Sequence, residues 1–126
     1  MSLFPGFSEK TIAVDGAEIF LRMGGSGPPL LLLHGFPQTG AMWAPLAQRL
    51  AQHFTLVIPD LPGYGRSSKP VDEPGHIQMS KRRLGDQLAG LMGALNFSEF
   101  RLVGHDRGAR VTHRMCLDHA DRILRA

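Results

Sequence analysis

Short, mostly apolar segments alternate with segments of helical periodicity along this 126-residue sequence. This alternation is the feature that most restricts its fold. Residues 30–33, 54–58 and 100–103 are short and mostly apolar, as is typical of strands buried on both faces. Residues 43–51 and 79–95 place apolar side chains at the three- and four-residue spacing of a helix with one buried stripe. Strands that alternate with helices predict βαβ units, and therefore a largely parallel sheet with helices on both faces.

The two ends of the sequence extend this pattern. Residues 9–14 and 18–23 flank Asp15-Gly16, a dipeptide typical of tight hairpin turns, so the chain is expected to open with an antiparallel pair of strands. Residues 107–119 predict a helix, and residues 123–124 predict the start of a further strand.

Composition and charge narrow the class of protein. The content of 43% hydrophobic and 20% charged residues is that of a globular domain, and its longest apolar run, residues 28–33, is far too short to cross a membrane. The net charge of +3 arises from interspersed acidic and basic residues, so no nucleic-acid partner is expected. A single cysteine and the lack of an export signal favour a cytoplasmic location. The scattered histidines form no compact ligand spacing, so neither a metal nor a cofactor is expected.

The segment Gly104-His105-Asp106-Arg107-Gly108 carries the strongest chemical signal. It places a glycine two residues before and two residues after Asp106, at a predicted junction between a strand and a helix. This is the pattern of a nucleophile elbow, with Asp at the position where esterases have Ser. Small flanking residues are required because a side chain in so tight a turn would collide with the neighbouring strand or helix. From the residues alone, an equally good interpretation is that Asp106 only caps the helix.

Two further segments accompany the elbow in the expected order. Residues 30–37 run from a buried strand into a glycine turn, where a backbone N–H can complete an oxyanion hole with that of Arg107. Residues 57–67 leave the intervening strand through a loop rich in Gly and Pro on the same edge of the sheet. Together with the elbow, these segments resemble the α/β-hydrolase superfamily, and the resemblance extends from about Glu9 to the end of the chain.

This resemblance implies an α/β-hydrolase fold of which the chain contains the N-terminal half, an antiparallel hairpin leading into a mostly parallel sheet. Residues 1–126 are accordingly expected to be the N-terminal portion of a single core domain, with the cap domain and the C-terminal half absent from this chain. The apolar pattern taken alone indicates only an α/β fold.

Within the superfamily, an Asp nucleophile points to the dehalogenase and epoxide hydrolase branch. The string from His105 to Arg110, together with residues 34–39 and 60–65, resembles the haloacetate (fluoroacetate) dehalogenases. That resemblance implies that Asp106 attacks the carbon bearing the halogen and that Arg107 and Arg110 hold the substrate carboxylate. Arginines three residues apart share a face of a helix, and two guanidinium groups suit a planar carboxylate. The alternative is that Arg110 is an ordinary solvated surface residue.

The implied reaction is displacement of halide from a small 2-haloacid through an aspartyl ester. The backbone N–H groups of Phe36 and Arg107 would hold the oxyanion formed when water attacks that ester. The superfamily places the His base and its acidic partner beyond the helix after the elbow, so the chain is expected to need a missing C-terminal half, in the same polypeptide or a companion chain, and to be inactive alone. An epoxide hydrolase with the same nucleophile, or a non-catalytic binding or regulatory fragment, remains an alternative. The expected ligand is a small anionic substrate, and a homodimer is left open.

Five other residues receive structural interpretations. His34 is expected to support its turn, and Asp60 to stabilise the loop that follows its strand. His105 is expected to be buried beneath the site, because neighbouring residues on a strand face opposite sides of a sheet. Trp43 and Cys116 are expected in the core. The strand at residues 100–103 is expected to form a raw edge of the sheet.

Overall fold

The computed structural model describes residues 4–35, 38–69 and 80–126. Six strands form one sheet in the order β1-β2-β4-β3-β5-β6. The strands are β1 (Ser8–Val14), β2 (Ala17–Gly25), β3 (Pro29–Leu33), β4 (Thr55–Pro59), β5 (Phe100–Gly104) and β6 (Ile123–Arg125). The helices are the short 3₁₀ helix η1 (Gly40–Trp43) and the α-helices α1 (Ala44–Leu50), α2 (Lys81–Ala94) and α3 (Arg107–Asp118). Each strand and helix predicted from the sequence is present within a few residues of its expected bounds.

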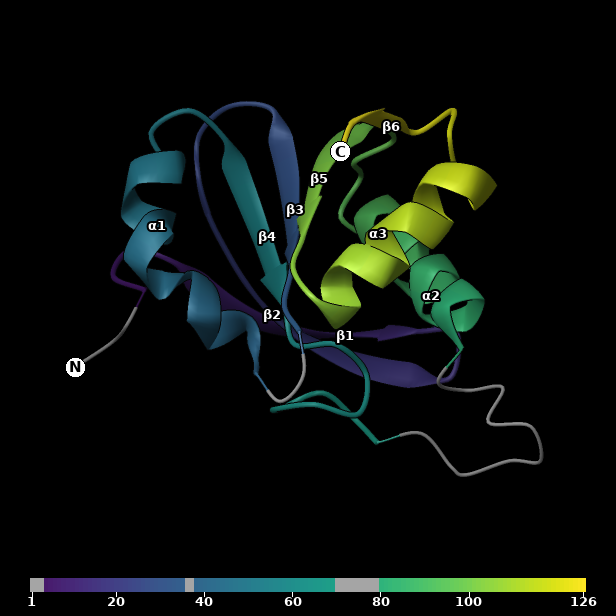
Figure 1. Cartoon of the computed structure of the whole chain (residues 1–126). Helices are drawn as coiled ribbons and strands as arrows, with labels where there is room; N and C mark the ends of the chain where they lie inside the picture. Colours follow the sequence, from purple (N-terminus) through teal and green to yellow (C-terminus); the bar gives the residue numbers. More distant parts are fainter. Residues whose placement is uncertain (1–3, 36–37, 70–79) are drawn as a thin grey trace.

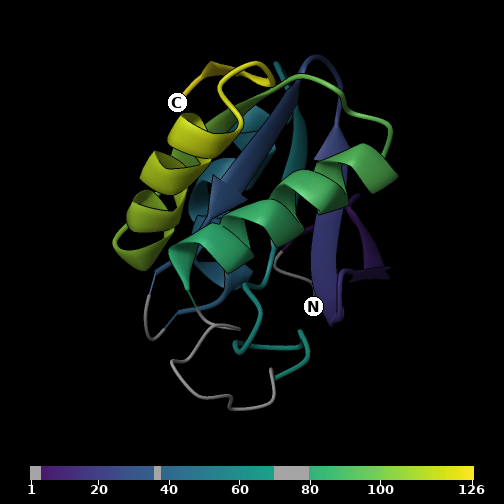
Figure 2. The ribbon, with the colours of Figure 1, turned by 90° about the vertical axis from the view of Figure 1, so that its right-hand side faces the viewer.

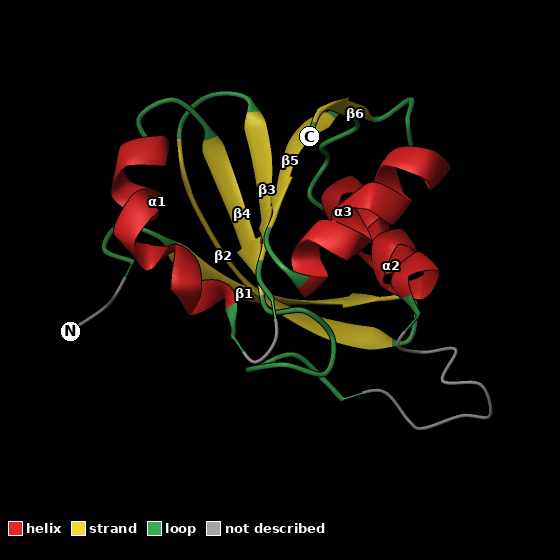
Figure 3. Ribbon diagram, viewed as in Figure 1, coloured by secondary structure: helices red, strands yellow, loops and turns green. Residues whose placement is uncertain are grey.

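Helices cover both faces of this sheet, as predicted. Figures 1 and 3 show η1 and α1 on one face and α2 and α3 on the other, and Figure 2 looks onto the face covered by α2 and α3. The leucines of β3 divide between the two layers. Leu31 and Leu33 belong to the core cluster that contains α2 and α3, whereas Leu30 and Leu32 belong to the cluster that contains α1. This alternation explains why β3 is a continuous apolar run.

The strand directions bring three strand ends to one edge. β1 and β2 form the predicted antiparallel hairpin, whose turn residues Asp15 and Gly16 have φ angles of 44° and 83°. β2 is antiparallel to β4, while β3 pairs in parallel with β4 and with β5. The carboxyl ends of β3, β4 and β5 therefore lie along the same edge, where ligands bind in open α/β sheets.

The prediction that β5 is an edge strand with no partner on one side is only partly correct. β6 pairs in parallel with the beginning of β5, with Phe100 opposite Ile123 and Arg101 opposite Arg125. The prediction is wrong for these two residues because the short segment after α3 turns back onto the sheet. Val103, later in β5, is 41% exposed. In the part of the chain that the structure describes, no helix is long and apolar enough to cross a membrane.

Candidate active site

Three loops meet at the carboxyl edge of the parallel strands, along the lower edge of the sheet in Figure 1. They follow β3, β4 and β5, and hydrogen bonds or close packing join them. Leu61 N–H donates to Nε2 of His34 at 2.9 Å, which links the first two loops. A Cβ added to Gly35 would lie 2.5 Å from Cβ of Asp106, so the first and third loops are in contact. Asp106 thus lies where loops that are far apart in the sequence come together.

Asp106 has the backbone conformation of a strained turn. Its φ and ψ angles are 55° and −115°, a combination that side-chain-bearing residues rarely adopt and that costs roughly 1–3 kcal/mol. A residue that caps a helix normally has extended backbone angles and accepts a hydrogen bond with its side chain. The side chain of Asp106 makes no capping hydrogen bond, and the residue is exposed. The interpretation of Asp106 as a simple helix cap is therefore wrong.

The three glycines around Asp106 permit this strained turn. A Cβ at Gly108 would lie 2.5 Å from the carbonyl oxygens of both Leu33 and His34, and a Cβ at Gly104 would collide with the carbonyl of Gly108. A Cβ at Gly35 would lie 2.9 Å from Oδ2 of Asp106. The start of α3, the end of β5 and the turn after β3 consequently pack with backbone against backbone, as the small-residue pattern predicted.

Arg107 and Arg110 both lie in the first turn of α3, directly after Asp106. Arg107 is half-buried and Arg110 is exposed. One turn further along, Arg114 is held by Asp118, with Nε and Nη2 at 2.8 and 3.0 Å from the two carboxylate oxygens. This hydrogen-bonded pairing raises the pKa of Arg114 and lowers that of Asp118. Arg107 and Arg110 thus lie closer to the elbow along α3 than Arg114 does.

The predicted oxyanion hole can be placed only in part. The backbone N–H of Arg107 is in the first turn of α3, where amide groups point away from the helix. Phe36, which was expected to supply the second N–H, lies outside the described residues.

His34 and Asp60 are buried polar residues that the sequence placed only in general structural roles. Each is almost fully buried, with 0% and 2% of its surface exposed. Asp60 accepts backbone hydrogen bonds from Gly40 at 2.8 Å and from Arg66 at 3.0 Å, so its loop-stabilising role is confirmed. The contact of His34 with Leu61 was not predicted, since nothing in a single sequence links residues 27 positions apart.

Predictions for the other residues divide. Trp43 is buried, as expected, whereas Cys116 is only half-buried. His105 is exposed, so its expected burial is wrong. β5 ends at Gly104, and beyond that residue the alternation of a strand no longer sets the direction of a side chain. Within the described ranges, no three His, Cys, Asp or Glu residues gather in a way that could hold a metal ion.

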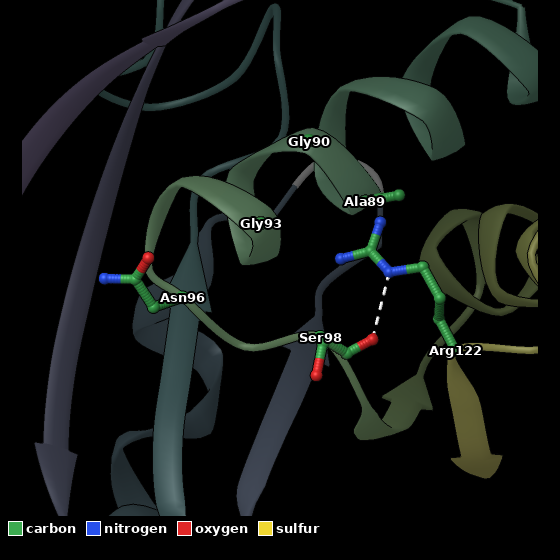
Figure 4. Close-up of a pocket in the computed structure, with 6 residues that line it drawn as sticks. All are labelled: Ala89, Gly90, Gly93, Asn96, Ser98 and Arg122. Atoms are coloured by element: carbon green, nitrogen blue, oxygen red, sulfur yellow. Dashed lines mark hydrogen bonds between the residues drawn. The ribbon is translucent and has the colours of Figure 1, made fainter.

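A separate hollow of about 450 Å³ lies at the end of α2 (Figure 4). Arg122, one of the polar residues in its lining, donates from Nε to the carbonyl of Ser98 at 3.1 Å and from Nη2 to that of Phe97 at 3.2 Å. These bonds hold the loop that enters β5 at its amino end. This hollow is therefore at the opposite end of β5 from Asp106.

Comparison with known proteins identifies the family. Residues 28–126 match the family model described as the alpha/beta hydrolase fold. The chain belongs to the α/β-hydrolase family. The α/β-hydrolase fold predicted from the elbow and its two accompanying segments is thus confirmed.

Two relatives of this α/β-hydrolase chain carry different activity names. It is 51% identical over 122 residues to a fluoroacetate dehalogenase from Burkholderia sp., covering 97% of this chain and 40% of the relative. It is 37% identical over 119 residues to an epoxide hydrolase from Caballeronia sordidicola, covering 94% of this chain and 35% of that protein. A solved structure from Nostoc sp. PCC 7120 with a provisional α/β-hydrolase name superposes with a TM-score of 0.93 at 48% identity, covering 95% of this chain and 41% of the other. The chain spans about two fifths of the length of these hydrolases.

Proposed function

We propose that Asp106 is the nucleophile of a hydrolase that displaces halide from a small 2-haloacid such as haloacetate. The observation that carries this proposal is the strained backbone of Asp106, with φ at 55°, whose carboxylate makes no capping bond to α3. Strain of this kind persists where the surrounding structure enforces it, and it gathers at functional sites. The 51% identity to a fluoroacetate dehalogenase supports the choice of substrate class.

The proposed reaction has two steps. A carboxylate oxygen of Asp106 attacks the carbon that bears the halogen, a C–O bond forms, and the halide leaves with the electron pair of the C–X bond. Water then attacks the carbonyl carbon of the resulting ester, which returns the carboxylate and releases the 2-hydroxyacid. The backbone N–H groups of Arg107 and Phe36 would stabilise the oxyanion of the second step.

Substrate recognition is assigned to the first turn of α3. Arg107 and Arg110 would bind the carboxylate of the haloacid, since two guanidinium groups can donate several charge-assisted hydrogen bonds to a planar anion. The positive end of the α3 dipole adds to the attraction for a negatively charged substrate.

The second step also needs a general base. We propose that a His and an acidic partner come from a C-terminal half, in the same polypeptide or a companion chain, and that residues 1–126 are the N-terminal portion of one core domain. A homodimer is compatible with this arrangement. The single cysteine suits a reducing compartment, and we place the protein in the cytoplasm.

An epoxide hydrolase that uses the same carboxylate is the second candidate. Its support is the 37% identity to an epoxide hydrolase, over 94% of this chain. A neutral epoxide would gain little from two guanidinium groups, so we rank it below the haloacid. Turnover of epoxides with no release of halide from haloacetate would reverse this ranking.

The nucleophile can be tested in the complete protein by the substitution Asp106→Asn. We expect turnover to be abolished while the circular dichroism spectrum and thermal midpoint are kept, because the amide has nearly the same shape as the carboxylate. In single-turnover reactions in heavy-oxygen water, the label should enter the Asp106 carboxylate of the wild type, since water attacks the carbon of the enzyme ester. Normal activity in a sample shown by mass spectrometry not to have deamidated would contradict the proposal, as would label found only in the product.

A further inference from the structure

Reciprocal hydrogen bonds join the loop after β3 to the loop after β4. Nε2 of His34, in the first loop, accepts from the backbone N–H of Leu61 in the second at 2.9 Å. Oδ1 of Asp60, in the second loop, accepts from the backbone N–H of Gly40 at the far end of the first at 2.8 Å. We call these two contacts the loop brace. Buried polar side chains that cross between loops in this way fix the spacing of the loops, because an unpaired buried group would be costly.

The His34 ring is committed to one tautomer. Since Nε2 accepts a hydrogen bond from the backbone N–H of Leu61, the ring proton is on Nδ1, which donates to the carbonyl of Gly35 at 3.0 Å. Burial lowers the pKa of His34, and the hydrogen bond to Gly35 and the negative charge of Asp60 offset this only in part. The edge of the ring packs against Tyr64, with 5.3 Å between the ring centroids. His34 is thus a neutral side chain with both ring nitrogens bonded.

The brace reaches the nucleophile through Gly35. The Gly35 carbonyl that His34 binds also accepts from the backbone N–H of Gln38 at 2.7 Å. The other side of Gly35 packs on Asp106, whose Oδ2 would be 2.9 Å from a Cβ at that position. A shift of the His34 ring would therefore move the peptide that lies against the carboxylate.

The loop after β4 is itself a firm support. Oδ2 of Asp60 accepts from the backbone N–H of Arg66 at 3.0 Å. The hydroxyl of Ser67 donates to the carbonyl of Asp60 and accepts from the backbone N–H of Phe20 in β2 at 2.9 Å. These hydrogen bonds fix the loop after β4 to the sheet. The loop brace therefore joins the loop after β3 to a fixed part of the structure.

We propose that His34 and Asp60 are positioning residues that hold Gly35 against Asp106. This inference rests on the proposed function, in which the backbone N–H of the residue after Gly35 is an oxyanion donor for ester hydrolysis. The attack of Asp106 on a C–X carbon creates no oxyanion, whereas the hydrolysis of the ester does. Loss of the brace should consequently slow ester hydrolysis more than ester formation.

The kinetic test uses the complete protein with bromoacetate as the probe. Halide release in a single turnover reports ester formation, and the decay of ester-modified protein by mass spectrometry reports hydrolysis. His34→Asn keeps a donor near Nδ1 but offers no acceptor to Leu61, so we expect ester decay to slow at least about tenfold with ester formation nearly unchanged. His34→Gln can place an oxygen near Nε2 and should recover part of the loss, while Asp60→Asn should resemble His34→Asn. His53→Asn, at an exposed histidine after α1, is the matched control and should change neither step.

The outcomes separate this inference from the proposed function. Wild-type protein that forms no ester on Asp106 would overturn the proposed function, and the positioning role with it. Ester that forms and decays normally in His34→Asn, or equal slowing of both steps, would overturn the positioning role alone. Nitrogen NMR of wild-type protein with isotope-labelled histidine tests the brace without any variant. For His34 the spectrum should show a protonated Nδ1 and an unprotonated Nε2, and this state should persist below pH 6.5, the ordinary pKa of histidine. The opposite tautomer would contradict the loop brace.

Discussion

Asp106 sits in a conformation that only its neighbours make tolerable. A φ of 55° and a ψ of −115° cost roughly 1–3 kcal/mol. The backbones of Gly35, Gly104 and Gly108 pack closely around the elbow and enforce these angles. A Cβ at any of the three positions would collide with a neighbouring atom. At the scale of single residues, the strained backbone of Asp106 therefore lowers local stability, and its carboxylate does not cap α3.

The arginines of the first α3 turn give a prediction at the same scale. If Arg107 and Arg110 bind the substrate carboxylate, each charge-assisted contact is worth on the order of 1.5–3 kcal/mol. Truncation of either to Met should then lower kcat/KM for haloacetate at least about tenfold, with a much smaller effect on a neutral epoxide or haloalkane. Arg114→Gln is the control, since that guanidinium is paired with Asp118. Equal losses on charged and neutral substrates would show that the arginines serve the fold and not recognition.

At the scale of elements, local pattern was sufficient for most of the fold. The apolar run of β3 and the apolar stripe of α2 could be predicted from the sequence, because buried positions recur with the period of each element. Residues 43–51 were predicted as one helix, whereas the structure divides this region into η1 and α1, with a proline in the first turn of α1. The sequence also indicated the tight turn at Asp106, since an elbow is a local motif. It could not locate the His34–Leu61 contact or the exposure of His105, because both depend on how separate loops meet.

Two glycine substitutions test how closely the elements pack. Gly108→Ala should destabilise the fold by about 1–3 kcal/mol, because its Cβ meets the rigid backbone carbonyls of Leu33 and His34. Gly93→Ala is the matched control within α2, where a Cβ would meet only Nη2 of Arg122 at an ordinary 3.7 Å. That control should stabilise the protein by about 0.5–1 kcal/mol, since Ala is the better helix former. Chemical denaturation of the complete protein measures both, and a Gly108→Ala variant as stable as Gly93→Ala would refute the close packing of α3 on β3.

At the scale of the whole molecule, apolar surface gathers on the α1 side of β5. A hollow of about 310 Å³ lies there, and its lining includes Leu30, Phe54 and Val103. Val103 and Leu124 are 41% and 55% exposed. Among the described residues, β6 pairs with only the first part of β5, and the later part has no strand partner on that side. Exposed apolar surface next to an incompletely paired strand favours association with another segment or another molecule.

The last prediction concerns residues 1–126 as an isolated polypeptide. The proposed mechanism needs a base to hydrolyse the ester on Asp106, and in that proposal the base is a His from a C-terminal half. The isolated polypeptide should therefore react with haloacetate at most once per molecule, and its exposed apolar surface should make it prone to aggregate. Size-exclusion chromatography, thermal unfolding and a halide-release assay test this, and addition of the proposed C-terminal half should restore repeated turnover. A monomeric, cooperatively unfolding polypeptide that turns over haloacetate repeatedly without any addition would show that these residues are sufficient for catalysis.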